Sequence, residues 1–202
     1  MMVIGLTGKA CCGKNVVAEQ FAGQGWEVVD VDKLGYPILQ ASARELERDF
    51  GPSVIAPDGT VDRKALGGIV FADPGKLKVL ESITHPKMVS ECRRIIQKRD
   101  CPVVVLNAAL LSRMHLDEIC DLVVFVKASY WVRYHRANVR DTMDLTRFRN
   151  RESAQKDITI TNIRPDCEIV ILDNNGSLES IHRQVLSLCA KISKAIQKDR
   201  KA

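Results

Sequence analysis

The segment from Gly8 to Lys14 has the residue types and the spacing of a phosphate-binding loop. It follows the pattern G-x-x-x-x-G-K, between an apolar run and a helix-like run. In such a loop the glycines allow a tight backbone path, backbone N–H groups point at phosphate oxygens, and the lysine adds charge. We expect the loop to cradle the phosphates of a nucleotide. The alternative is a glycine-rich strand-to-helix turn that binds nothing.

Oxygen-bearing side chains near this loop are candidates for general-base chemistry and for holding Mg²⁺. Asn15 stands where the full motif has a Ser or Thr whose hydroxyl binds Mg²⁺, and an amide oxygen also coordinates this ion. Asp30 and Asp32 are two residues apart on what we expect to be an extended chain, and both stay close to the loop. We expect one of them to act as general base for a hydroxyl nucleophile or to position Mg²⁺. The alternative is that Asp32 caps a helix starting at Lys33.

Arginines are dense between residues 133 and 151. Arg133, Arg136 and Arg140 step by three and four residues, so they share one face of a helix. Arg147, Arg149 and Arg151 follow. This density favours a mobile segment that closes over polyphosphate, where arginine neutralises the charge being transferred. The alternative is a solvated basic face.

Cys11 and Cys12 lie inside the loop, where a helix N-terminus and Lys14 are conditions that lower a thiol pKa. We expect alkylation there to block nucleotide binding. The chain's seven cysteines form no CxxC pair and no zinc-like spacing with its four histidines. We therefore expect reduced thiols, most of them small core residues.

Five short apolar runs must position these residues, and segments with helical character separate them. Near-continuous apolar runs of strand length are typical of parallel strands buried on both faces, which need crossover connections. We therefore predict an α/β fold with a parallel five-stranded sheet flanked by helices. Its ligands would bind beyond the carboxyl ends of the strands. The predicted strands are residues 2–7, 26–30, 102–106, 121–126 and 168–172, and residues 178–198 form a long amphipathic helix.

The composition is that of one soluble domain. The chain has 202 residues, of which 46% are hydrophobic and 27% are charged. A formal net charge of +5 favours an anionic partner. The apolar runs are too short to cross a membrane, and the first dozen residues lack the pattern of a signal peptide, so we expect a cytoplasmic protein. With 5% aromatic residues, not interleaved with the basic ones, nucleic-acid binding is disfavoured.

Elements along nearly the whole chain resemble the dephospho-coenzyme A kinases, a family of P-loop kinases related in fold to nucleoside monophosphate kinases. The motifs are specific in this order and combination. They comprise the loop from Ile4 to Lys14, Val29 to Asp32, Phe50-Gly51, Asp58-Gly59, Asp62-Arg63, Ala65-Leu66, Val70-Phe71, Ile83 to Pro86, Leu110-Leu111, Arg136 and Arg140, Gln155, and Asp173 to Ser177.

The resemblance implies a function: phosphorylation of the ribose 3′-hydroxyl of dephospho-coenzyme A by ATP with Mg²⁺, the last step of coenzyme A synthesis. Asp32, Lys14 and Arg140 would be catalytic, Asp32 and His85 would bind the acceptor, and Asn15 and Asp30 would hold Mg²⁺. The ATP site would comprise Gly8, Lys9, Ala10, Cys11, Cys12, Gly13, Lys14, Asn15, Val16, Arg136 and Arg140. From composition alone, the lone His85 is more often structural.

The resemblance also implies one P-loop kinase domain over residues 1–202. Its core would be about 1–32 and 100–202, its helical acceptor-binding region about 33–99, and its lid about 140–157. The pattern departs at Asn15, at Tyr36 in place of an arginine, and at Arg113 in place of an acidic residue. Two alternatives remain: a catalytically impaired protein that binds a nucleotide or coenzyme A, and a kinase for another nucleoside-like acceptor. Oligomeric state stays open.

Overall fold

The computed structural model describes residues 1–199. These fold as two compact units, one built from Met1–Asp30 with the chain from Lys98 onward, and the other from Val31–Gln97. The last residues of the expected core, 200–202, lie outside the described residues.

The first unit is built on a five-stranded sheet in the order β2-β3-β1-β4-β5, and every neighbouring pair is parallel. The sheet and its crossover helices confirm the predicted fold class, because parallel neighbours cannot be joined by a tight turn. Its strands match the five apolar runs, with small shifts at their ends. They are β1 (Met2–Thr7), β2 (Glu27–Asp30), β3 (Val103–Asn107), β4 (Leu122–Lys127) and β5 (Glu168–Asp173).

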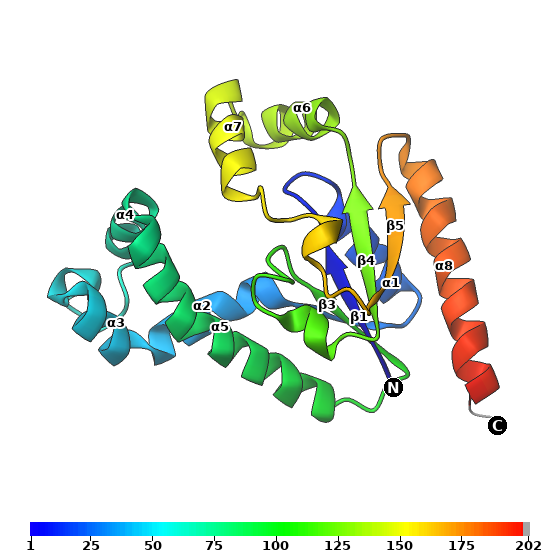
Figure 1. The fold of residues 1–202 in the computed structure, drawn as a ribbon, viewed down its shortest axis with the longest axis horizontal. Helices are drawn as coiled ribbons and strands as arrows, with labels where there is room; N and C mark the ends of the chain where they lie inside the picture. The colour runs from blue at the N-terminus through cyan, green and yellow to red at the C-terminus, as the bar shows by residue number, and fades with distance from the viewer. Residues whose placement is uncertain (200–202) are drawn as a thin grey trace. The chain divides into compact units, whose positions relative to one another are not determined.

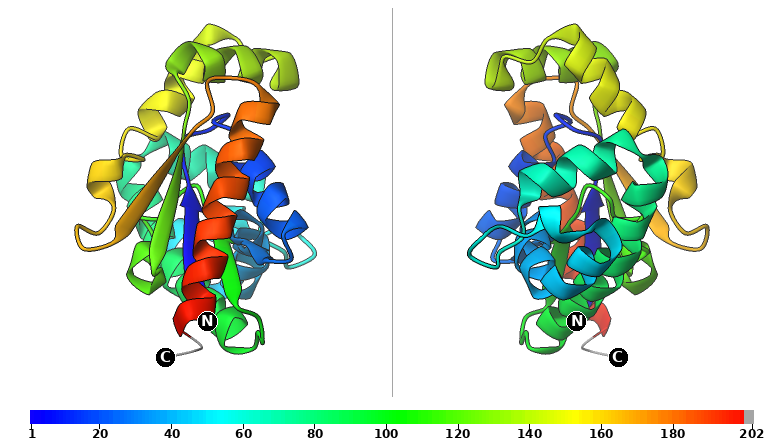
Figure 2. Two further views of the ribbon diagram at one scale, coloured as in Figure 1. Left: turned by 90° about the vertical axis from the view of Figure 1, so that its right-hand side faces the viewer. Right: turned by 90° about the vertical axis from the view of Figure 1, so that its left-hand side faces the viewer.

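One face of the sheet is covered by α1 (Lys14–Gly23) and α8 (Leu178–Asp199), which runs back along β5 (Figures 1 and 2). Phe21 of α1 is fully buried and stacks on Trp26 with the ring centroids 5.0 Å apart. From α8, apolar side chains at three- and four-residue steps reach the same core. They are Ile181, Val185, Leu188 and Ile192. Burial of apolar side chains from α1 and α8 therefore holds both helices against the sheet. The position of α1 in turn sets the position of the loop that precedes it.

The other face of the sheet is covered by the segment after β3, which includes the short helix η2 (Leu116–Ile119). A Cβ at Gly5 of β1 would lie 2.8 Å from a methyl carbon of Leu111 and 3.0 Å from the Cys120 sulfur. The central strand is glycine here because the covering segment packs directly on its backbone.

Each of the five strands ends in a polar residue at the carboxyl edge of the sheet. These are Thr7, Asp30, Asn107, Lys127 and Asp173. In parallel sheets ligands bind beyond this edge. The loop from residue 8, and the helices α6 (Tyr130–Asp141) and α7 (Leu145–Ala154) with the turn η3 (Ile160–Asn162), follow from strands at the same edge.

The second unit is helical, as its sequence pattern predicts. Its elements are α2 (Val31–Ala41), α3 (Ala43–Phe50), η1 (Pro52–Val54), α4 (Arg63–Ala72) and α5 (Pro74–Gln97), and its core is Leu46, Phe50, Val54, Val61, Leu66, Val70 and Ile83. Asp62 caps α4, because its carboxylate accepts from the backbone N–H of Lys64 at 2.8 Å and of Ala65 at 3.0 Å. Among the described residues, no helix is both long and apolar enough to cross a membrane.

All seven cysteines are free thiols, and their burial differs. Cys11 and Cys101 are partly exposed, whereas Cys12, Cys92, Cys120, Cys167 and Cys189 are buried. Burial raises the pKa of Cys92 and of Cys189 to about 11, because it disfavours the charged thiolate.

We expect N-ethylmaleimide to label two thiols of the native protein near neutral pH, Cys11 and Cys101, because the other five are inaccessible and stay protonated. Intact-mass and peptide mass spectrometry would count the adducts, with protein unfolded in guanidinium as the control that exposes all seven. Rapid native labelling of Cys12 would contradict the burial seen here.

Candidate active site

The loop between β1 and α1 follows a path that needs glycine at two positions. Gly8 has φ +149°, and a Cβ there would lie 2.4 Å from the carbonyl oxygen of Val126. Gly13 has φ +95°, and a Cβ there would lie 2.1 Å from the amide nitrogen of Asn174. Both positions exclude an L side chain on backbone and packing grounds. The loop is therefore pressed against the ends of β4 and β5.

Two side chains from outside the loop hold its carbonyl at Cys12. The Asn174 Nδ2 donates to the Cys12 carbonyl oxygen at 2.8 Å, and the Arg136 Nη1 donates to the same oxygen at 3.3 Å. Arg136 also donates to the Asn174 carbonyl oxygen at 2.9 Å. Arg136 of α6 and Asn174 after β5 thus shape the loop together.

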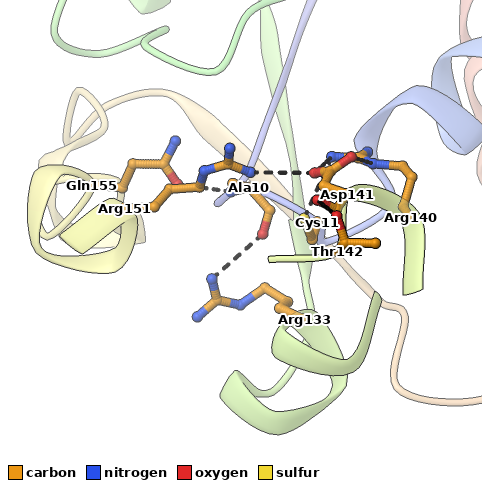
Figure 3. Close-up of polar contacts among 8 residues, drawn as sticks. All are labelled: Ala10, Cys11, Arg133, Arg140, Asp141, Thr142, Arg151 and Gln155. Carbon is orange, nitrogen blue, oxygen red and sulfur yellow. Dashed lines mark hydrogen bonds and ion pairs between the residues drawn. The ribbon is translucent and has the colours of Figure 1, made fainter. Parts of the chain in front are cut away.

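Helix α7 and the residue that caps it approach the loop from a second side. The Gln155 Oε1 accepts from the Ala10 backbone N–H at 2.8 Å. Glu152 pairs with Lys9 of the loop and, at 2.7 Å, with the buried Arg133 of α6. Figure 3 shows Gln155 and Arg133 on either side of Ala10. The arginine-rich segment is therefore bonded to the loop.

Lys14 opens α1, and its ammonium donates to the Asn107 Oδ1 at the end of β3. Asn107 is 4% exposed, and its Nδ2 donates to the Asn15 Oδ1 at 3.3 Å. Asp30 is the register partner of Asn107 on the neighbouring strand β2. One buried asparagine at the end of β3 therefore bonds to the first two residues of α1, and Asp30 ends the neighbouring strand.

Two arginines share one carboxylate above the loop. Arg140 forms a fork with Asp141, with both N–O distances 2.8 Å, and Arg151 of α7 lies 3.7 Å from the same carboxylate (Figure 3). The hydrogen bond from Arg140 holds the pKa of Asp141 below its usual value. Arg140 also approaches the Cys11 sulfur at 3.7 Å. As predicted, Arg133, Arg136 and Arg140 lie on one helix.

A pocket of about 430 Å³ opens beside the loop. Its walls carry both apolar and polar groups, and Val139 and Leu178 are each 69% exposed. Its lining residues are Cys11, Gly13, Val16, His135, Arg136, Val139, Arg140, Asn174 and Leu178. An exposed apolar pair beside a basic loop is the arrangement that a flat aromatic group with an anionic tail would cover.

The two remaining candidates, Asp32 and His85, belong to the second unit. Asp32 lies in the first turn of α2, which begins at Val31, and His85 lies within α5. The expected extended chain from Asp30 to Asp32 is therefore wrong, because β2 ends at Asp30 and the helix starts one residue later. The alternative that Asp32 caps a helix from Lys33 is wrong for the same reason.

The expectation of a lowered thiol pKa in the loop is wrong for Cys12. Cys12 is 1% exposed, and this burial raises its pKa, outweighing the backbone hydrogen bond and the charge of Lys14. Burial of the Cys12 thiol thus raises its pKa by more than the helix N-terminus and Lys14 lower it.

Arg113, which departs from the family pattern, is held by an ion pair. Its Nε donates to the Asp157 Oδ2 at 2.7 Å, and its Nη2 donates to the Ala154 carbonyl oxygen at 2.9 Å. The basic residue after β3 therefore ties this segment to the end of α7.

Sequence reasoning missed three residues that hold the site together: Asn107, Glu152 and Asn174. The first ends an apolar strand, and the second is the single acidic residue of the arginine-rich helix α7. Asn174 belonged to a motif of the resemblance but had no assigned role. A polar residue at the end of a buried strand was the one signal available for Asn107.

Most of the chain matches one known protein family. The family model described as dephospho-CoA kinase matches residues 2–180. A dephospho-CoA kinase of Shouchella clausii is 35% identical over 94% of this chain and 98% of its own length.

Two solved structures share this fold. TT1252 from Thermus thermophilus has a TM-score of 0.79 and 29% identity, covering 94% of this chain and 97% of its own. The dephospho-CoA kinase from Campylobacter jejuni has a TM-score of 0.68 and 25% identity, covering 96% of this chain and 98% of its own. With a family model matched over most of its length, this chain belongs to the dephospho-CoA kinase family.

Proposed function

We propose that this kinase transfers the γ-phosphoryl group of ATP to the ribose 3′-hydroxyl of dephospho-coenzyme A, giving coenzyme A and ADP. The observation that carries the proposal is the loop from Gly8 to Lys14. It is shaped for phosphates, opens a helix, and is bonded to arginine-bearing helices on two sides. Family membership supplies the acceptor.

In this proposal the loop and the first turn of α1 bind the phosphates of ATP. Backbone N–H groups at a helix N-terminus and the Lys14 ammonium both favour anionic oxygens. The pocket beside the loop binds the adenine ring of ATP. Val139 and Leu178 pack against the faces of the ring, and the Asn174 side chain lies at its edge. The binding residues are Gly8 to Val16 with Arg136 and Arg140.

Asp32 acts as the general base. The acceptor oxygen attacks the γ-phosphorus, the bond from that phosphorus to the β–γ bridging oxygen breaks, and the hydroxyl proton passes to the Asp32 carboxylate. ADP leaves with the bridging oxygen. Support for this role comes from the match to the family's base position, two residues after the end of β2.

Residues 33–99 form the acceptor-binding region in this proposal, and His85 contacts the acceptor there. The lid is residues 140–157. Its Arg140 neutralises charge on the transferring group, because catalysis of phosphoryl transfer is chiefly positioning and charge compensation. The Asp141 carboxylate holds Arg140 and Arg151 close together, ready for a polyphosphate to replace it.

The residues present fit a Mg²⁺ ion that is held mainly by phosphates. Among the described residues no cluster of three or more His, Cys, Asp or Glu side chains forms a metal site. Mg²⁺ in kinases needs only one or two protein oxygens besides phosphate and water. The Asn15 amide oxygen and the Asp30 carboxylate are such oxygens. Bound Mg²⁺ would neutralise phosphate charge.

We place the protein in the cytoplasm. All of its cysteines are free thiols, which agrees with a reducing compartment.

The function is tested by ADP release from ATP and Mg²⁺ with and without dephospho-coenzyme A. We expect acceptor-dependent ADP that is lost in Lys14→Ala, because this change removes the ammonium that binds phosphate. ATP binding without acceptor-dependent ADP would favour the impaired homologue. Turnover with another nucleoside-like acceptor alone would favour the alternative of a kinase for that acceptor.

Asp32→Asn should lower kcat about a hundredfold while leaving the Kd for ATP nearly unchanged, the effect of losing a general base. Steady-state kinetics and ATP titration would separate the two quantities. Asp100→Asn, which changes an exposed carboxylate just before β3 and outside the proposed site, is the control. Near-normal turnover in Asp32→Asn would remove Asp32 from the base role.

Asn15→Ser should reduce the Mg²⁺ concentration needed for the half-maximal rate, because a short hydroxyl replaces the longer amide at the motif position. Rates would be measured across a Mg²⁺ titration at saturating ATP. An unchanged Mg²⁺ dependence would show that Asn15 is not a ligand.

A further inference from the structure

Glu152 of α7 lies between two cations that come from different elements. One carboxylate oxygen pairs with the Lys9 ammonium of the phosphate loop, and the other accepts from the Arg133 Nη1 of α6 at 2.7 Å. Loop, α6 and α7 therefore meet at one carboxylate.

Arg133 is the buried member of this group. Its side chain is 5% exposed, and it also donates to the Ala128 carbonyl oxygen at 3.2 Å and to the Ala10 carbonyl oxygen at 3.5 Å. A buried guanidinium needs a charged partner, and Glu152 supplies it. Burial opposes ionisation of Glu152, but hydrogen bonds from Arg133 and Lys9 outweigh it and hold the Glu152 pKa below its usual value. Glu152 is thus ionised near neutral pH.

Two neighbours of Glu152 on the same segment face the loop region. Arg151 shares Asp141 with Arg140, and Gln155 accepts from the Ala10 N–H. Because Glu152 is one residue from Arg151 and three from Gln155, fixing Glu152 fixes both. Besides this anchor, α7 is held by the hydrogen bond from Ala10 to Gln155 and by the apolar cluster around Phe148, against which Cys11 of the loop packs.

We propose that Glu152 is a positioning residue for ATP binding: it fastens α7 to the phosphate loop through Lys9 and to α6 through Arg133, and so holds Arg151 and Gln155 in place. This proposal rests on the function proposed above. It gives the Lys9 side chain a specific role, as the partner of Glu152 in the loop.

The test uses four single variants and one double variant of the full chain. Glu152→Gln keeps the shape and removes the charge. Lys9→Met removes the ammonium but leaves Arg133 its carboxylate, so it serves if Glu152→Gln folds poorly. Lys9→Arg is the conservative change that retains the pair. Glu168→Gln removes an exposed carboxylate at the start of β5, the strand end opposite the loop, and is the matched control.

We measure the Kd for ATP by calorimetry and the rate of tryptic cleavage after Arg149, Arg151 and Lys156. Glu152→Gln and Lys9→Met should each raise the Kd about tenfold, and their double variant should be no weaker than Glu152→Gln, because both remove one interaction. Cleavage at these sites should accelerate in all three and slow again when ATP is added. Lys9→Arg should raise the Kd less than Lys9→Met, because it retains a cation that can pair with Glu152. The control Glu168→Gln should match the wild type. In steady state, KM for ATP should rise more than kcat falls.

Three outcomes would overturn the proposal. The first is a lowered Tm with the Kd for ATP unchanged, which would mean a purely structural role. The second is a Kd increase in the double variant equal to the product of the single increases, which would mean independent effects. The third is wild-type cleavage of α7 in both charge-removing variants. Because binding and cleavage need no acceptor, they report on Glu152 even if the wild type fails to phosphorylate dephospho-coenzyme A.

Discussion

The close packing of the phosphate loop against the ends of β4 and β5 is the constraint on which the rest of the site depends. A Cβ at Gly8 would collide with the Val126 carbonyl, and one at Gly13 with the Asn174 amide. The glycines are therefore required twice, by their positive φ angles and by their neighbours. Asn174 and Arg136 in turn donate to the Cys12 carbonyl, which holds the backbone path of the loop in place.

The charged side chains around the loop form ion pairs that differ in burial. The pairs of Asp141 with Arg140 and Arg151 are exposed, and surface ion pairs stabilise weakly. In the function proposed above, the phosphates of ATP therefore replace Asp141 at little cost. The pair of Arg133 with Glu152 differs, since the guanidinium is 5% exposed and removing the partner of a buried charge costs about 3–5 kcal/mol. The basic segment thus contains one buried arginine, Arg133, with a strong ion pair, and two more exposed arginines, Arg140 and Arg151, with weak ones.

Much of the fold was predictable because its elements carry strong local patterns. Apolar runs at all five strands, and the three- and four-residue steps from Ile181 to Ile192, report burial directly. At Asp32 the local pattern predicts the wrong structure. Two aspartates separated by one residue look like an extended strand end, yet α2 starts at Val31, since a helix boundary depends on packing of the following turns.

The sequence by itself determined the phosphate loop, the arginine helix and the parallel sheet, because glycine spacing and hydrophobic periodicity are properties of neighbouring residues. Only the tertiary structure decided that Cys12 is buried with a raised pKa and that Asn107 joins Lys14 to Asn15. It also decided that Glu152 pairs with Lys9, 143 positions away. Such pairings depend on which strand ends become neighbours, and in a parallel sheet crossover connections bring distant residues together.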